Sequence, residues 1–248
     1  MSIFTGIFGK KKLNSPVDLS ELQVDMHSHI LPGIDDGAAN LSVSKKMVEQ
    51  LTGLGFRKLI ATPHIMTDIY KNTPQTINKA KEALNEELVK ENISTEITFA
   101  AEYMLDEALM DNIKQHDLLT MGKNFVLIEL PYFNEPPNLL DVFFQLNLQG
   151  YRVILAHPER YVYWYDDFSK FEQLKDRDVY FQLNILTFGD MYALPTKKII
   201  DNLVKHNMIE FIGTDIHDDQ QIEILEKALY EPGLARLIES GNLMNHLL

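Results

Sequence analysis

The sequence predicts a single-domain α/β protein whose parallel strands close into a (β/α)7 barrel. Seven apolar, strand-like runs alternate strictly with seven helical patterns along the 248 residues, and no linker, repeat or low-complexity segment interrupts them. No G-x-G-x-x-G turn follows any of these strands, which disfavours the alternative of an open, doubly wound sheet. A chain of this length can bury one core of the required size.

The alternating segments follow one another in a regular order. Each expected strand is a short apolar run that ends at a loop, and these runs lie at residues 22–27, 58–62, 96–101, 125–130, 152–156, 179–184 and 209–213. Helical patterns fill the intervals, at residues 42–54, 75–91, 106–115, 138–149, 168–175, 196–206 and 219–230. Right-handed crossovers would bring the carboxyl ends of the strands to one face, where barrel enzymes carry their active sites.

The barrel is expected to occupy residues 21–248, with residues 1–20 as an N-terminal tail or a cap on the barrel. This segment begins with an apolar stretch and continues with Lys10, Lys11 and Lys12. A signal peptide carries its positive charges before the apolar stretch, so this order argues against one. The alternative is a short amphipathic segment in weak peripheral contact with a membrane. No run of 18 apolar residues predicts a spanning helix.

Composition excludes several kinds of chemistry. The chain has no cysteine, which rules out disulfides, thiolate metal ligands and a cysteine nucleophile, and is compatible with a cytoplasmic location. The formal net charge of −13 argues against nucleic acid as a partner, because its phosphates would be repelled. Carboxylates that bind metal cations would neutralise part of this charge.

The stretch from Asp25 to Gly37 is the most informative part of the chain. It reads D-M-H-S-H-I-L-P-G-I-D-D-G and runs from an expected strand into a loop. Residues two apart on a strand share a face, so His27 and His29 can reach the same metal ion. Asp36 follows in the loop, whereas Asp25 and Asp35 are expected to be turn residues or to support ligands from behind.

Similar residues end the later strands, except the one at 179–184. They are His64, Glu102, Glu129, His157, Asp215 and His217. Taken singly, each has an ordinary alternative: a loop histidine can be hydrogen bonded, a glutamate can be solvated, and Asp36 can cap the next helix. Together, five histidines and four carboxylates at one barrel mouth would repel one another or stay unsatisfied without cations, so we predict that they bind metal. His116, His206 and His246 lie in or near helical segments and are expected at the surface.

Nine ligands exceed what one ion needs, so two or three divalent ions are predicted. Nitrogen and oxygen ligands without sulfur suit Mn²⁺, Fe or Zn²⁺. Bridging carboxylates would hold such ions about 3.5–4 Å apart, the spacing of two-metal hydrolytic sites.

A possible anion-binding group follows the fifth strand. Arg160 lies three residues after His157, and its planar guanidinium suits a phosphate, although a salt bridge at the rim is the alternative. Tyr161, Tyr163 and Trp164 come next. They could line a pocket for a substrate aromatic ring, or they could pack the loop down or contact another subunit.

Together these motifs resemble the PHP (polymerase and histidinol phosphatase) superfamily, and within it the manganese-dependent bacterial protein-tyrosine phosphatases of capsule and exopolysaccharide loci. The segments A-T-P-H, L-I-E-L, A-H-P-E-R-Y and T-D-I-H join the first motif in carrying the resemblance. It implies a distorted (β/α)7 barrel, the PHP fold, with a three-metal centre, Mn first and Fe or Zn as alternatives. The implied ligand sets are His27, His29, Glu102 and Asp215; Glu102, Glu129 and His157; and Asp36, His64 and His217, with Arg160 on the phosphate.

The resemblance implies hydrolysis of phosphotyrosine on proteins by attack of a metal-bound hydroxide, with a bacterial tyrosine kinase as the expected partner. The sequence departs from these relatives at one point: Asp218–Ile222 lacks the second arginine that they carry beyond the last histidine, so catalysis is expected to be slower. A small-molecule phosphomonoesterase such as a histidinol-phosphate phosphatase is the nearest alternative. More distant are a metal-dependent amidohydrolase, many of which use a lysine where this chain has Glu129, and an inactive binding module.

Overall fold

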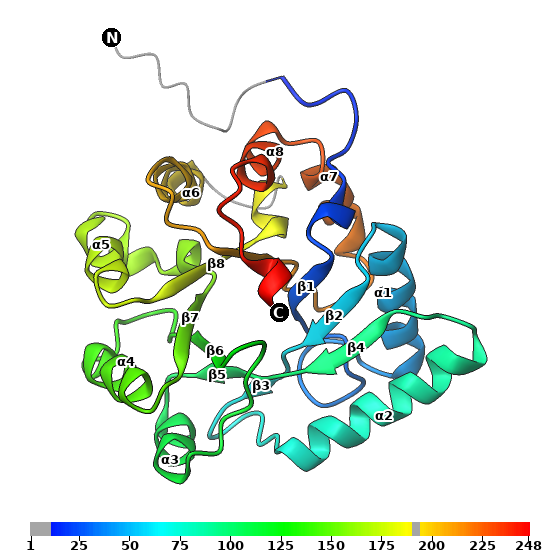
Figure 1. Ribbon diagram of the computed structural model, residues 1–248, viewed down its shortest axis with the longest axis horizontal. Helices are drawn as coiled ribbons and strands as arrows, with labels where there is room; N and C mark the ends of the chain where they lie inside the picture. The colour runs from blue at the N-terminus through cyan, green and yellow to red at the C-terminus, as the bar shows by residue number, and fades with distance from the viewer. Residues whose placement is uncertain (1–10, 190–193) are drawn as a thin grey trace.

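Strands and helices alternate along the chain as the sequence predicts. The computed structural model describes residues 11–189 and 194–248 (Figure 1). The strands are β1 (Val24–Ser28), β2 (Lys58–Ala61), β3 (His64–Ile65), β4 (Glu96–Phe99), β5 (Glu102–Met104), β6 (Phe125–Glu129), β7 (Arg152–Ala156), β8 (Tyr180–Asn184) and β9 (Phe211–Gly213). The helices are α1 (Leu41–Gly53), α2 (Pro74–Lys90), α3 (Glu107–Gln115), α4 (Leu139–Leu148), α5 (Ser169–Lys175), α6 (Leu194–Lys205), α7 (Ile222–Ala228) and α8 (Pro232–Glu239).

Two of the seven predicted strands are interrupted. The second, predicted at 58–62, ends at Ala61 and resumes beyond Thr62–Pro63 as β3; the third, predicted at 96–101, ends at Phe99 and resumes beyond Ala100–Ala101 as β5. Proline has no N–H to donate to a strand neighbour, which accounts for the first interruption. The Glu102 N–H still donates to the Pro63 carbonyl at 3.2 Å, so the chain stays in register across both gaps.

The parallel strands form a closed ring. Their order is β1-β2-β4 in one sheet and β3-β5-β6-β7-β8-β9 in the other, and every pair within a sheet is parallel. The segment after β9 closes the ring against β1, because the Asp215 N–H donates to the His27 carbonyl at 2.7 Å and the His29 N–H donates to the Ile216 carbonyl at 2.9 Å. This confirms a distorted seven-stranded barrel, with helices arranged around it (Figure 1).

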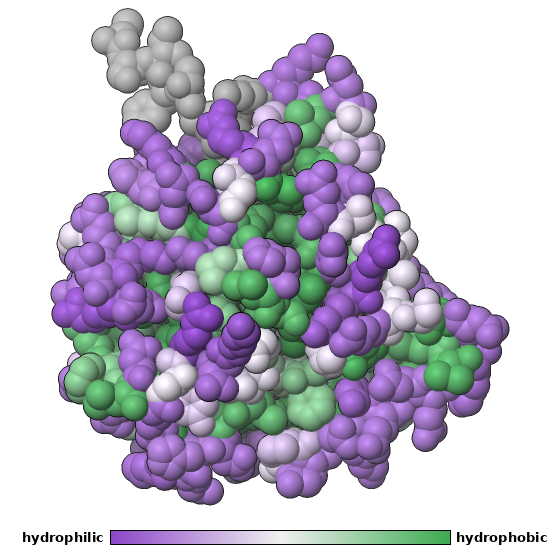
Figure 2. Space-filling view, viewed as in Figure 1, coloured by the Kyte–Doolittle hydropathy of each residue, from purple (hydrophilic) through white to green (hydrophobic). Residues whose placement is uncertain are grey.

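The barrel interior is filled by apolar side chains at the end opposite the strand carboxyl termini. Met26, Phe125, Leu127 and Phe211 are buried there, and Met244 and Leu248 pack against the same cluster from the C-terminal segment. Figure 2, in the same view as Figure 1, shows hydrophilic residues over the outer helices. Hydrophobic residues gather toward the middle of the face that is turned to the viewer. A functional site is therefore expected at the other end of the barrel, where the strand carboxyl termini lie.

The C-terminal segment is more ordered than the sequence predicts. Beyond the last predicted helix the chain forms α8, which begins at Pro232, and a 3-10 turn at Asn245–Leu247. The buried Asn245 amide donates to the carbonyls of Val24 and Ile212 and accepts from the Ile212 N–H. It therefore ties β1 to β9 beside the closure of the ring.

Residues 11–20 lie against the C-terminal helices. The Leu13 N–H donates to the Tyr230 carbonyl at 2.9 Å and the Val17 N–H donates to the Leu229 carbonyl at 2.8 Å. These contacts hold this part of the N-terminal segment against the end of α7, while residues 1–10 lie outside the described residues. None of the helices in the described part of the chain combines the length and hydrophobicity needed to cross a bilayer.

Removing the Asn245 amide should weaken the closure of the ring. Asn245→Ala leaves the buried N–H and carbonyl of Ile212 without this partner, and we expect the free energy of unfolding to fall by about 2–3 kcal/mol. Urea denaturation followed by circular dichroism measures this change. Asn242→Ala, at an exposed position of the same segment, is the matched control, and an equal effect of both variants would contradict the role given to Asn245.

Candidate metal centre

The strand carboxyl ends bring the nine predicted ligand residues to one mouth of the barrel. His27, His29, Glu102 and Asp215 form the most buried group, with one ligand atom of each lying within 4.8 Å of the others. The His27 Nε2 atom is 3.2 Å from Glu102 Oε2 and 3.2 Å from Asp215 Oδ1. The corresponding distances from His29 Nε2 are 3.3 and 3.4 Å, so four donor atoms surround one point.

A second group shares Glu102 with the first. His157 Nε2 is 3.0 Å from Glu102 Oε1 and 3.4 Å from Glu129 Oε1. His64 also approaches this pair, with Nδ1 3.2 Å from Glu102 Oε2 and 3.8 Å from Glu129 Oε2. Glu102, Glu129 and His157, the second set that the resemblance implies, thus lie together, and His64, which the resemblance places in the third set, also lies close to them.

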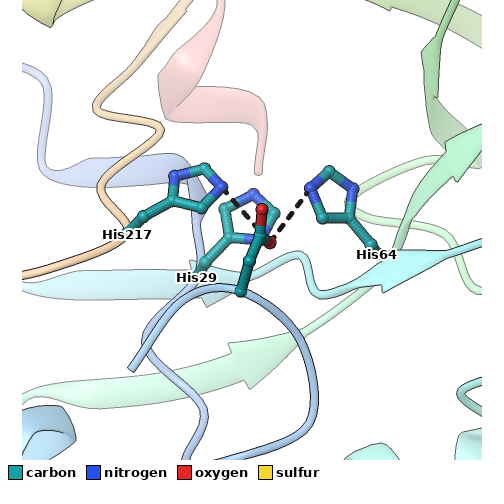
Figure 3. Close-up of side chains that lie close together, drawn as sticks. His29, His64 and His217 are labelled. Carbon is teal, nitrogen blue, oxygen red and sulfur yellow. Dashed lines mark ion pairs between the residues drawn. The ribbon is translucent and has the colours of Figure 1, made fainter. Parts of the chain in front are cut away.

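The third group lies nearest the solvent. Figure 3 shows His29, His64 and His217 converging from separate segments, with ion pairs as dashed lines. Asp36 Oδ1 lies 3.5 Å from His64 Nε2 and 3.7 Å from His217 Nε2, and the rings of His29 and His217 stack with centroids 4.0 Å apart. His64 thus presents one ring nitrogen to each of two neighbouring groups.

Several buried atoms in these groups have no hydrogen-bond partner in the protein. They are Glu102 Oε2, Glu129 Oε2, Asp215 Oδ1, His64 Nδ1 and His157 Nδ1. Buried acceptors left in this state cost free energy that a cation would recover. The donor set of imidazole nitrogens and carboxylate oxygens therefore fits divalent metal ions.

The ring orientation of the two first histidines supports the same fit. His27 Nδ1 lies 2.9 Å from Gln182 Oε1, and His29 Nδ1 lies 2.8 Å from Asp35 Oδ2. With Nδ1 protonated to donate to these oxygens, each ring turns the lone pair of its Nε2 toward the other, across 3.3 Å. Asp35 thus supports a ligand from behind, as expected.

The charges of the group are strongly coupled. Burial alone would lower the pKa of His27, but the carboxylates of Glu102 and Asp215 outweigh it and raise this pKa to about 9. Burial, reinforced by the negative charge of Glu102, raises the pKa of Glu129 to about 8. Neighbouring carboxylate charge raises both pKa values, but burial opposes the shift at His27 and is the largest cause of the shift at Glu129.

The backbone around the group is unusually close-packed. A Cβ atom on Gly37 would lie 2.1 Å from the His29 carbonyl oxygen, and one on Gly213 would lie 2.7 Å from the His27 Cβ. His157 and Asp215 adopt positive φ values of 30° and 52°, a conformation that non-glycine residues rarely adopt. Both residues point their side chains into the barrel mouth, so the unusual backbone conformations occur at predicted ligand positions.

Two side-chain amides on β8, which were not among the predicted site residues, join His27 to Asp215 by hydrogen bonds. The Gln182 Nε2 donates to Asn184 Oδ1 at 2.8 Å, and the Asn184 Nδ2 donates to Asp215 Oδ2 at 2.7 Å. With the contact between Gln182 and His27, a continuous chain of hydrogen bonds joins His27 to Asp215. The signal was present, because two polar residues alternate with Phe181 and Leu183 on an otherwise buried strand.

Arg160 lies at the rim of the mouth, on the 3-10 turn after β7. Its Nη1 donates to Asp215 Oδ2 at 3.0 Å and to the Tyr132 hydroxyl at 3.3 Å. The Tyr132 hydroxyl donates in turn to Glu129 Oε1. Tyr132 was not among the predicted site residues, although it follows the β6 ligand by only three positions.

The predicted aromatic wall needs correction. Tyr161 and Trp164 are buried and Tyr163 is half-buried, so the first two have no surface on which a substrate ring could stack. The Tyr161 hydroxyl donates to the Ala156 carbonyl, and the Trp164 indole N–H donates to Glu135. These rings pack the loop down, which was the alternative considered for them.

The position of the missing second arginine is occupied by residues with other contacts. Gln221 Oε1 accepts from the His217 N–H at 2.8 Å, and Ile222 is buried against the core. Neither side chain can be exchanged for arginine without losing its contact. The helical histidines His116, His206 and His246 are exposed, as expected.

Breaking the amide chain should loosen the first group of ligands. Gln182→Leu removes the acceptor for His27 Nδ1–H and the donor to Asn184, and we expect about 10–100-fold weaker metal binding. Competition with a fluorescent chelator measures this affinity. Gln182→Glu keeps an acceptor for His27 and should recover part of the loss. Gln145→Leu, on the exposed face of α4, is the control; wild-type affinity in Gln182→Leu would show that the chain does not position the ligands.

The chain is similar in sequence and in fold to known proteins. Residues 23–225 match the family model described as "Capsular polysaccharide synthesis, CpsB/CapC". The chain is 30% identical to the tyrosine-protein phosphatase YwqE of Bacillus subtilis (strain 168) over 79% of this chain and 77% of that protein. It is 23% identical to the tyrosine-protein phosphatase CpsB of Streptococcus agalactiae over 79% of this chain and 83% of that protein.

Solved structures show the same fold. A crystal structure from a study of YwqE from Bacillus subtilis and CpsB from Streptococcus pneumoniae, described as metal-dependent tyrosine phosphatases, superposes with a TM-score of 0.74. It is 27% identical and covers 89% of this chain and 96% of that one. A histidinol phosphate phosphatase from Lactococcus lactis, solved with zinc, L-histidinol and phosphate, has a TM-score of 0.55 at 12% identity and covers 89% and 95% of the two chains.

Proposed function

The chain belongs to the CpsB/CapC family of capsular polysaccharide synthesis proteins, and from this premise we propose that it is a metal-dependent phosphatase that hydrolyses phosphotyrosine on proteins. One observation carries the proposal: buried carboxylates and imidazoles meet at one barrel mouth and leave acceptor atoms without a hydrogen-bond donor, which bound cations would satisfy. The relatives and the matched crystal structure, named as tyrosine phosphatases, support the choice of reaction.

We assign the predicted nine residues as ligands of two or three divalent ions. The ligand-type residues are His27, His29, Asp36, His64, Glu102, Glu129, His157, Asp215 and His217. Mn²⁺ is the proposed ion, with Fe or Zn as alternatives, since imidazole and carboxylate together suit all three. The proposed partner is a phosphotyrosine protein such as a bacterial tyrosine kinase of the capsule or exopolysaccharide system, and the proposed location is the cytoplasm.

The residues of this chain would divide the work as follows. The bound ions supply Lewis acidity and a nucleophile at neutral pH. Arg160 binds the phosphoryl oxygens, because its guanidinium lies at the rim beside Asp215 and matches phosphate geometry. Hydrogen bonds with Gln182 and Asn184 hold His27 and Asp215 in place. Asp35 holds His29 in the same way, so the ligands need little rearrangement when ions bind. No cysteine is present to form a phosphocysteine.

A histidinol-phosphate phosphatase is the second candidate, favoured by the structural match to such an enzyme. At 12% identity this match concerns the fold alone. The tyrosine phosphatase relatives match far more closely in sequence, and they favour phosphotyrosine as the substrate.

Metal removal should abolish the activity. We expect wild-type protein to hydrolyse a phosphotyrosine peptide when supplied with Mn²⁺, to lose this activity in EDTA, and to regain it when Mn²⁺ is restored. Phosphate release measures all three states, with histidinol phosphate as the competing substrate. His27→Ala and Glu102→Ala should be inactive yet folded. Faster turnover of histidinol phosphate, or activity that survives EDTA, would contradict the proposal.

Loss of Arg160 should slow the reaction without removing the ions. Arg160→Ala deletes a donor to the charged phosphoryl group, and we expect kcat/KM to fall by about 10²-fold. Arg177→Ala, an exposed arginine after α5, is the matched control and should behave as wild type. Steady-state kinetics are read beside metal content, which should stay unchanged in both variants. An Arg160→Ala enzyme of wild-type efficiency would remove this residue from the phosphate site.

A further inference from the structure

We propose that Tyr132, rather than the aromatic cluster after Arg160, is the residue that contacts the phenyl ring of the substrate and selects aryl over alkyl phosphates. The inference rests on the proposed phosphatase function and concerns the same site. It follows from the position of one side chain at the meeting point of a ligand, the phosphate-binding arginine and the solvent.

Tyr132 contacts both sides of the proposed phosphate position. Its hydroxyl donates to Glu129 Oε1 and lies 3.3 Å from Arg160 Nη1. Its ring stacks beside His157, with centroids 6.1 Å apart and an interplanar angle of 23°. A phosphoryl group held between the ions and Arg160 would therefore lie next to Tyr132, close to its hydroxyl.

Tyr132 also has the exposed surface that Tyr161 and Trp164 lack. Tyr132 as a residue is 39% exposed and the neighbouring Phe133 is 89% exposed, whereas Tyr161 and Trp164 are 0% and 1% exposed. The ester oxygen of a bound phosphotyrosine must lead its ring outward, because the ligand groups fill the interior. The ring then leaves the mouth along the open face of Tyr132, and offset stacking of two aromatic rings is favourable.

The buried cluster has a defined part in this arrangement. The Tyr163 hydroxyl donates to the Pro131 carbonyl at 3.1 Å, and the Trp164 N–H donates to Glu135 Oε2 at 2.8 Å. These two contacts flank Tyr132 on the loop that follows β6. The cluster thus fixes the loop that presents Tyr132, and acts on the substrate only through it.

Tyr70 is the competing aromatic residue at the mouth. Its ring stacks on His64 with centroids 5.7 Å apart, so it lies beside the third group of ligands. Tyr132, by contrast, lies 3.3 Å from Arg160 Nη1 through its hydroxyl, and the phosphate position beside Arg160 therefore favours Tyr132.

Direct binding of two phosphonates tests the inference without relying on turnover. Phenylphosphonate and methylphosphonate present the same kind of anion, with and without a ring. Isothermal titration of Mn²⁺-loaded protein gives the ratio of their Kd values. We expect wild type to prefer phenylphosphonate, Tyr132→Ala to lower this preference about 5–10-fold, and Tyr132→Phe to keep it, because the ring and not the hydroxyl makes the contact. Phe144→Ala, at an exposed aromatic of α4, should match wild type.

Thermal unfolding and metal content confirm that each variant is intact, and Tyr132→Leu replaces Tyr132→Ala if the latter does not fold. An unchanged preference in these variants, an equal weakening of both phosphonates, or a loss found in Tyr70→Ala instead would overturn the inference. A loss in Tyr132→Phe as large as in Tyr132→Ala would also overturn it, since the hydroxyl would then be responsible. Failure of the proposed function appears separately, as wild-type protein that does not hydrolyse phosphotyrosine peptide.

Discussion

Carboxylates and imidazoles buried together at the barrel mouth need positive charge between them, and the rest of the site is arranged around that need. Glu102 and Asp215 each face two histidine nitrogens at 3.2–3.4 Å, yet one oxygen of each carboxylate has no hydrogen-bond donor. Such a group is unfavourable in a folded protein unless protons or cations enter it. The surrounding hydrogen bonds hold the ligands in place before any ion binds, as Asp35 does for His29.

The barrel is distorted where it serves this group. The ring closes between β1 and the residues after β9, at the two segments that supply His27, His29 and Asp215. Close approach there requires Gly213, and Asp215 takes a left-handed conformation. The interruption of β2 at proline starts a new short strand at His64, which turns that ring to face two groups at once. Local irregularity is thus concentrated at the mouth, while the opposite end is filled by apolar side chains.

The alternation of apolar runs and helical patterns was sufficient to predict the barrel, because each strand–helix unit has its own periodicity. The candidate ligands were predictable because parallel strands bring their carboxyl ends together. Side-chain contacts across the ring are harder to predict from sequence. The hydrogen bonds of Gln182 and Asn184 join them to residues 155 and 31 positions away. The sequence leaves the role of the cluster around Trp164 open between a substrate pocket and packing of the loop, because composition alone cannot tell a buried aromatic from an exposed one. Tyr132 was missed for the same reason.

The metal content of purified protein tests the central claim most directly. Protein prepared without chelator and without an affinity tag that binds metal should contain two or three equivalents of transition metal per chain, as measured by elemental analysis. A variant with both His27→Ala and Asp215→Ala should contain fewer, because the most buried group then loses half of its ligands. Wild-type protein that is folded and free of stoichiometric metal, even after incubation with Mn²⁺, would contradict the account.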